Sequence, residues 1–108
     1  LFAGHETTTN AIGNSIFTLL TQLKTVPNNN YLLSSIDLLL NECLRFESPV
    51  QRMGRYTTSA IEVGDTVIPE DKRILLLIGA ANRDPKIFNQ PNNFIFDSRS
   101  YGMFFIFK

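Results

Sequence analysis

Residues 41–50 read Asn-Glu-Cys-Leu-Arg-Phe-Glu-Ser-Pro-Val, and they combine a possible charged pair with a proline that would end a helix. Glu42 and Arg45 stand three positions apart, so on a helix they share one face and can pair. A solvated pair is the simpler interpretation, because an exposed pair of this kind stabilises a helix by only about 0.2–0.5 kcal/mol. Pro49 follows closely and pushes the residue before it out of the helical region. The sequence therefore predicts a helix that ends in a charged pair, where a buried pair would hold the following loop.

Apolar residues at helical spacing predict a helix over residues 2–24 and a second helix that ends before Pro49. Pro27 and the three asparagines after it predict a loop between the two helices. The predicted apolar face of the first helix consists of Ile12, Ile16, Leu19, Leu20 and Leu23, and that of the second of Leu32, Ile36, Leu39, Leu40, Cys43 and Leu44.

From Gly54 onward the apolar period changes to that of strands. Residues 61–63 and 66–68 flank Gly-Asp, which predicts a hairpin with a two-residue turn. Residues 73–78 are predicted to form a buried strand, and the segment after Asn82 an irregular stretch held by phenylalanines. The fold class is thus mainly α with a small β-sheet (α+β), in a single partial domain over residues 1–108.

The first helix carries a group of residues that could take part in ligand binding and proton transfer. Gly4 has no Cβ and would let a flat group approach the backbone. Glu6 beside Thr7 offers an acid and a hydroxyl that could pass a proton. Glycine and a run of threonines are poor choices for a helix interior, and such conflicts often mark functional sites. A capped or frayed helix start is the alternative.

Composition excludes several classes of function. Ten basic residues balance ten acidic ones, which gives no electrostatic reason to expect nucleic acid or an anionic membrane as a partner. The longest apolar run, residues 74–81, is far too short to span a bilayer. One cysteine permits no internal disulfide and does not imply an oxidising compartment. We expect a cytoplasmic protein, and the abrupt apolar start without a leader suggests an internal piece of a larger chain.

The order of these motifs closely resembles the cytochrome P-450 family, especially its soluble bacterial and archaeal members. An A-G-x-E-T-T helix comes first, then an E-x-x-R helix with Ser-Pro-Val, a Gly-Arg strand with a hairpin, and Ala-Asn-Arg-Asp-Pro. The resemblance covers residues 1–97. It implies a partial fold of that family: the C-terminal half of the long I helix, the K helix, the β-hairpin with its sheet, and the meander.

The resemblance also implies roles for residues on the oxygen side of a haem. Thr7 would hydrogen-bond the bound dioxygen, and Glu6 would help to deliver protons. Ala3 and Gly4 would lie over the haem face. Arg55 would pair with a haem propionate, although a surface arginine is the alternative.

Other implied roles are structural or concern the substrate. Glu42 and Arg45 would form a structural lock, and Val50 would line the substrate pocket. The arginine that usually follows in the meander is displaced to Arg99, and Phe96 stands where a proline is usual, which leaves the third partner of the lock open.

The implied function is that of a haem-thiolate monooxygenase, which inserts one atom of O2 into a small organic substrate. The cofactor would be haem b, and a ferredoxin- or flavoprotein-type donor would supply electrons. The family's ligand cysteine is missing, since residues 101–108 read YGMFFIFK. Cys43 is expected to be a buried packing residue and His5 a packing or pocket-facing residue, so no metal ligand is assigned. The chain alone is therefore expected to be inactive.

Two alternatives remain beside that function. The chain could be a non-catalytic, degenerate or truncated product that acts at most as a weak haem-associating or interaction module. It could also be an unrelated α+β binding domain that carries these motifs by chance.

Overall fold

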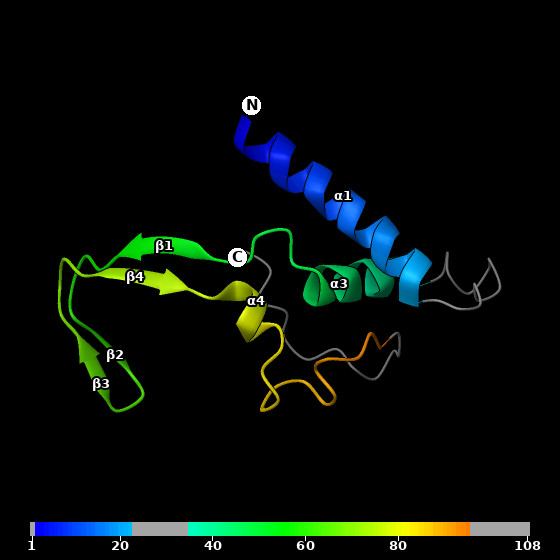
Figure 1. Cartoon of the computed structure of the whole chain (residues 1–108). Helices are drawn as coiled ribbons and strands as arrows, with labels where there is room; N and C mark the ends of the chain where they lie inside the picture. Colours follow the sequence, from blue (N-terminus) through cyan, green and yellow to red (C-terminus); the bar gives the residue numbers. More distant parts are fainter. Residues whose placement is uncertain (1, 23–34, 96–108) are drawn as a thin grey trace.

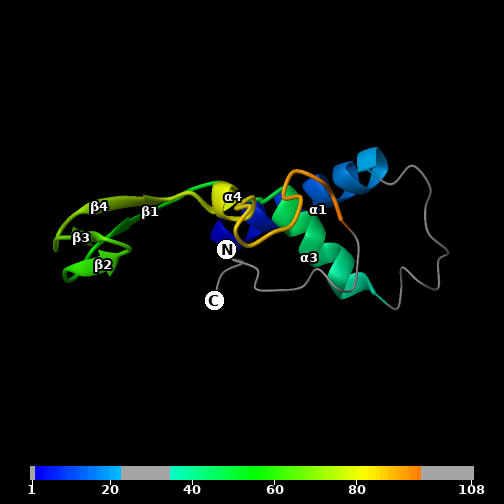
Figure 2. The same ribbon diagram turned by 90° about the horizontal axis from the view of Figure 1, so that it is seen from below.

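A computed structural model describes residues 2–22 and 35–95 (Figure 1). Two long helices lie at one end, and a strand region extends away from them, as both views show (Figures 1 and 2). The mixture of helices and small antiparallel sheets confirms the predicted fold class. The elements in chain order are α1 (Phe2–Gln22), α3 (Ile36–Phe46), β1 (Met53–Tyr56), β2 (Ile61–Val63), β3 (Thr66–Ile68), β4 (Arg73–Leu76) and α4 (Ile78–Ala81).

Helix α1 packs on α3 through small polar residues, which the apolar pattern did not predict. Ser15 and Thr18 are 8% and 1% exposed. Ile12, Ile16 and Leu20 are 56%, 54% and 78% exposed, and Leu19 is half-buried, so most of the predicted apolar face is not covered by α3. Small side chains let two helices approach closely, as α1 and α3 do here. Leu23 and Leu32 lie outside the described residues.

Helix α3 carries a charged residue at each end and buries only part of its predicted apolar face. It has Asp37 in its first turn and Arg45 in its last, which both suit the helix dipole. Leu39 and Cys43 are buried, whereas Ile36 and Leu40 are each 44% exposed. The helix ends at Phe46, three residues before the proline, and the amide of the next residue closes the last turn.

The predicted hairpin is confirmed, and its turn explains its register. Val63 pairs with Thr66 across Gly64 and Asp65. Gly64 has φ +57°, a backbone conformation that glycine adopts without strain.

The predicted buried strand over residues 73–78 is wrong in two respects. Strand β4 ends at Leu76, and Ile78 begins α4. Leu75 and Leu76 are 55% and 43% exposed. Strand β4 pairs with β1 in a two-stranded sheet, and the second layer that would bury it is absent from the described residues.

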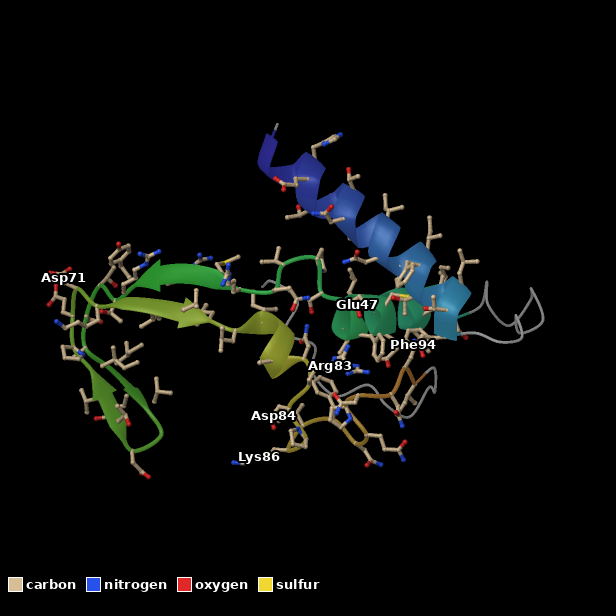
Figure 3. All side chains as sticks on the ribbon, viewed as in Figure 1. Glu47, Asp71, Arg83, Asp84, Lys86 and Phe94 are labelled. Atoms are coloured by element: carbon tan, nitrogen blue, oxygen red, sulfur yellow. The ribbon has the colours of Figure 1, made fainter. Side chains whose placement is uncertain are left out.

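Thr57 holds the far end of this sheet together. It is 5% exposed, and its Oγ1 donates to the Pro69 carbonyl at 2.7 Å and accepts from the Lys72 amide at 2.9 Å. Its backbone carbonyl accepts from the Asp71 amide at 2.9 Å. Figure 3 shows Asp71 at this end, far from α3. These bonds fix where β1 and β4 diverge into the hairpin.

Candidate functional site

Glu42 and Arg45 form a buried, bidentate ion pair. Their side chains are 5% and 4% exposed. Arg45 Nε donates to Glu42 Oε2 and Nη2 donates to Oε1, each at 2.7 Å. The interpretation as a solvated pair is therefore wrong, because burial removes the water that would otherwise screen the two charges.

The remaining donors of Arg45 collect backbone carbonyls from a distant segment. Nη1 donates to the carbonyls of Asn82 at 3.0 Å and Pro91 at 2.9 Å, and Nη2 donates to that of Asn93 at 2.9 Å. The guanidinium thus uses all of its N–H donors. Glu42 Oε1 also accepts the Ile95 amide at 2.7 Å. Together the two side chains hold the predicted meander against α3, and Arg99 lies outside the described residues.

Aromatic rings surround this pair. The Arg45 guanidinium lies 5.2 Å from the Phe88 ring centre, and Arg83 lies 4.2 Å from that of Phe46. Arg83 Nη2 also donates to the Phe46 carbonyl at 2.6 Å. Phe94 contacts Phe46 edge-on, with 5.7 Å between ring centres, and Figure 3 shows Arg83 and Phe94 beside α3. The aromatic anchors predicted for this segment are confirmed, and cation–π contacts add to its attachment.

The predicted oxygen-side residues lie near the start of α1. Gly4, His5 and Glu6 are exposed, and Thr7 is half-buried. A Cβ at Gly4 would meet no atom within 4 Å. These residues lie in the first two turns of a helix that begins at Phe2. Nothing is described of the side chain of Ala3.

Thr9 bonds to its own helix. Its Oγ1 donates to the His5 carbonyl one turn earlier at 2.8 Å, the local bond expected of a threonine inside a helix.

Arg55 lies on strand β1, far along the chain from the predicted oxygen-side residues of α1. It is exposed, its backbone pairs with Ile74, and its Nη1 donates to the Gly54 carbonyl at 3.0 Å. The structure therefore brings Glu42 and Arg45 into direct contact and leaves Arg55 on a separate surface. Val50 is half-buried in the loop between α3 and β1.

Cys43 is fully buried, in the interface between α3 and α1. Burial raises the pKa of its thiol from 9.0 to about 11; the Ser15 hydrogen bond lowers that pKa and the Glu42 charge raises it. A metal ligand needs the thiolate, so this environment disfavours Cys43 as a ligand. The part of the chain that the structure describes also holds no cluster of three or more His, Cys, Asp or Glu side chains suited to a metal ion.

The Cys43 thiol should be unreactive toward alkylating reagents in the folded protein, and the stability of the fold should fall at alkaline pH. We expect iodoacetamide at pH 8 to label Cys43 only after denaturation. Because the folded-state pKa is raised, the contribution of the neutral thiol is present below pH 9 and declines as the pH rises toward 11. Urea midpoints measured from pH 7 to 11 should fall more steeply in wild type than in Cys43→Ala. Rapid labelling of the native protein would contradict the buried placement.

Comparison with known proteins identifies the family. The family model described as Cytochrome P450 matches residues 32–97. The biotin biosynthesis cytochrome P450 of Bacillus subtilis is 42% identical over 95 residues, which cover 85% of this chain and 23% of that protein. Cytochrome P450 107B1 of Saccharopolyspora erythraea is 44% identical over 98 residues, with 87% of this chain and 24% of that protein covered.

Solved structures agree with the sequence relatives. P450BioI in complex with acyl carrier protein ligated to hexadec-9Z-enoic acid matches with a TM-score of 0.71 and 38% identity, over 91% of this chain and 26% of that one. Ligand-free cytochrome P450 TbtJ1 matches with a TM-score of 0.72 and 30% identity, over 93% and 27%. The chain spans about a quarter of the length of these relatives. Among the described residues, no helix is long and apolar enough to cross a membrane. With its family model, its relatives and its structural neighbours in agreement, the chain belongs to the cytochrome P450 family.

Proposed function

We propose that residues 1–108 are part of a haem-thiolate monooxygenase, which inserts one atom of O2 into an organic substrate. In this proposal they supply residues on the oxygen side of the haem and the structural lock formed by Glu42 and Arg45. The observation that carries the proposal is the start of α1. Glu6 is exposed, Thr7 follows it, and the helix surface at Gly4 is open. An acid, a hydroxyl and an open backbone surface within one helical turn are what proton delivery to a bound ligand requires. In this proposal the described residues form part of one domain.

The family implies a haem cofactor for the intact protein, and the chain's residues fit one side of it. Haem, when bound, supplies the iron chemistry that activates dioxygen. Arg55 would hold a propionate, since its exposed guanidinium keeps donors beyond the one on Gly54. Ala3 and Gly4 would border the ring, because a small residue and a glycine leave room beside the helix.

Cys43 does not fit as the ligand of a haem iron. It is fully buried in the helix interface, and its thiol pKa is raised to about 11. It is also the only cysteine among the 108 residues. We therefore propose that these residues alone lack monooxygenase activity, since the family's chemistry depends on a thiolate ligand.

Within the intact protein, each predicted residue would have a separate task. Glu6 would take protons from solvent, and the Thr7 hydroxyl would pass them on by hydrogen bonding. Val50 would contact the substrate. Glu42 and Arg45 would act on none of the reacting atoms, and would keep the meander in place through the bonds described above.

The proposed partners are a small organic substrate, O2 and a ferredoxin- or flavoprotein-type electron donor, in the cytoplasm. Neither nucleic acid nor a membrane is among them, consistent with a net charge of zero. One structural relative was solved with a fatty acid on acyl carrier protein. A long-chain fatty acid is therefore the first substrate class to test.

One spectrum and one labelling experiment test the proposal. The full-length protein that carries this segment, loaded with haem and reduced under carbon monoxide, should give a thiolate-type Soret band. Given hexadec-9Z-enoic acid and ¹⁸O₂, it should form a product with one labelled oxygen. A full-length protein without that band, or a product without label, would contradict the proposal.

The second candidate is a non-catalytic, weakly haem-associating or interaction module, and the exposed apolar side chains of α1 favour it for the chain alone. Ile12, Phe17 and Leu20 are 56%, 67% and 78% exposed, a surface that invites association. The 108-residue chain with haem should show no thiolate-type band. A band that disappears in Cys43→Ala would overturn the placement of that cysteine.

A further inference from the structure

The loop between α3 and β1 is anchored on both sides of Val50. Ser48 is 4% exposed, and its Oγ accepts a 2.7 Å hydrogen bond from Asn82 Nδ2. Beyond Val50, the backbone carbonyl of Gln51 accepts the Gly79 amide at 3.1 Å. Gly79 lies in α4 and Asn82 directly follows it. The position of Val50 therefore depends on α4, a helix almost thirty residues further along the chain.

The Gln51 side chain closes this loop and lies against the α4 backbone. Its Nε2 donates to the Ser48 carbonyl at 2.8 Å. Its Oε1 occupies the space that a side chain at position 79 would need, because a Cβ placed on Gly79 overlaps this oxygen. A larger residue at position 79 must therefore displace the end of the Gln51 side chain, which ends the bond of its amide to the Ser48 carbonyl.

We propose that Gln51 and Gly79 are positioning residues that set the shape of the substrate pocket through Val50. The proposal rests on the proposed function, from which the pocket role of Val50 is taken. Two fixed points, Ser48 and Gln51, leave the backbone between them little freedom, and Pro49 restricts it further. The Gln51–Gly79 contact should therefore decide where the Val50 side chain meets the substrate.

The test uses the full-length, haem-loaded protein as wild type, Gly79→Ala, Gln51→Ala and the double variant. Gly54→Ala is the matched control, since a Cβ at Gly54 meets no atom within 4 Å. Hydrogen–deuterium exchange of peptides that cover residues 48–52 reports on the loop. Soret titrations with imidazole and 4-phenylimidazole report on the pocket, because the smaller ligand measures access to iron and the larger one also measures shape.

Gly79→Ala should increase exchange in the loop and change the ratio of the two dissociation constants by about tenfold, as expected for a displaced pocket side chain. Gln51→Ala should increase exchange in the loop as well. In the Gln51→Ala background, Gly79→Ala should add nothing, because the overlapping amide is gone. Gly54→Ala should match wild type.

Three outcomes would overturn the inference or its premise. Unchanged exchange and an unchanged ratio in Gly79→Ala would contradict the positioning role. Equal effects of Gly79→Ala with and without Gln51 would place the cause in α4 itself. A wild-type protein whose Soret band responds to neither ligand would contradict the proposed function, and with it the pocket role of Val50. The two failures are therefore distinguishable.

Discussion

Replacing Arg45 with alanine should destabilise the folded protein by about 3–5 kcal/mol, the usual result of removing one partner of a buried ion pair. The variant leaves Glu42 buried without its counter-charge, and three carbonyls lose their donor, those of Asn82, Pro91 and Asn93. Urea unfolding of the full-length protein, followed by circular dichroism, measures the change. A loss this large will also reduce the yield of folded, haem-loaded protein.

Two further variants make this result specific. Arg45→Lys keeps the charge but cannot form the bidentate contact, so its destabilisation should be clear and smaller. Arg73→Ala removes an exposed arginine of β4 and should change stability by less than about 0.5 kcal/mol. An Arg45→Ala protein as stable as Arg73→Ala would show that the pair does not hold the meander.

Thr7→Ala should lower the rate of substrate oxidation by about 10²-fold, the lower range for loss of a proton-transfer group. Substrate affinity should change little, because the role proposed for Thr7 is in proton delivery rather than in substrate contact. Thr7→Ser keeps the hydroxyl and should restore most of the rate. Product formed per minute from hexadec-9Z-enoic acid measures the rate, and product formed per electron donor consumed measures the yield, which should also fall because lost proton delivery leaves electrons consumed without product.

Thr9 provides the matched control for this experiment. It is exposed on the same helix, and it has no part in the proposed proton delivery. Thr9→Ala should therefore leave the yield of product per electron unchanged. If Thr9→Ala and Thr7→Ala lower that yield equally, the effect belongs to the helix and not to a proton pathway through Thr7.

The sequence was sufficient to predict elements whose signals are local. The Gly64–Asp65 turn predicted the hairpin, and Pro49 predicted that α3 ends before it. The buried face of α1 could not be predicted in this way. Periodicity shows that a helix has an apolar side, but the neighbour that is present decides which side is buried, and here Ser15 and Thr18 face α3.

Only part of the candidate site could be predicted from the sequence. The spacing of Glu42 and Arg45 predicted their pairing, whereas burial and the remaining partners of Arg45 did not follow from it. Those partners are backbone carbonyls, and a carbonyl is present at every residue, so no residue type marks it. The contact of Gly79 with Gln51 could not be predicted for a related reason, since a glycine that lies against a distant side chain looks the same in sequence as one required for a turn.

The reach of Arg45 along the chain has a consequence for biosynthesis. Its acceptors lie 37, 46 and 48 residues further on, and Ile95, which donates to Glu42, lies 53 residues beyond that carboxylate. A ribosome adds about 5–20 residues per second, so α3 is synthesised about 2–10 seconds before its last partners. During that interval the two charges must stay hydrated or be shielded by a chaperone, and α3 acquires its final surroundings only when the chain has been made as far as Ile95.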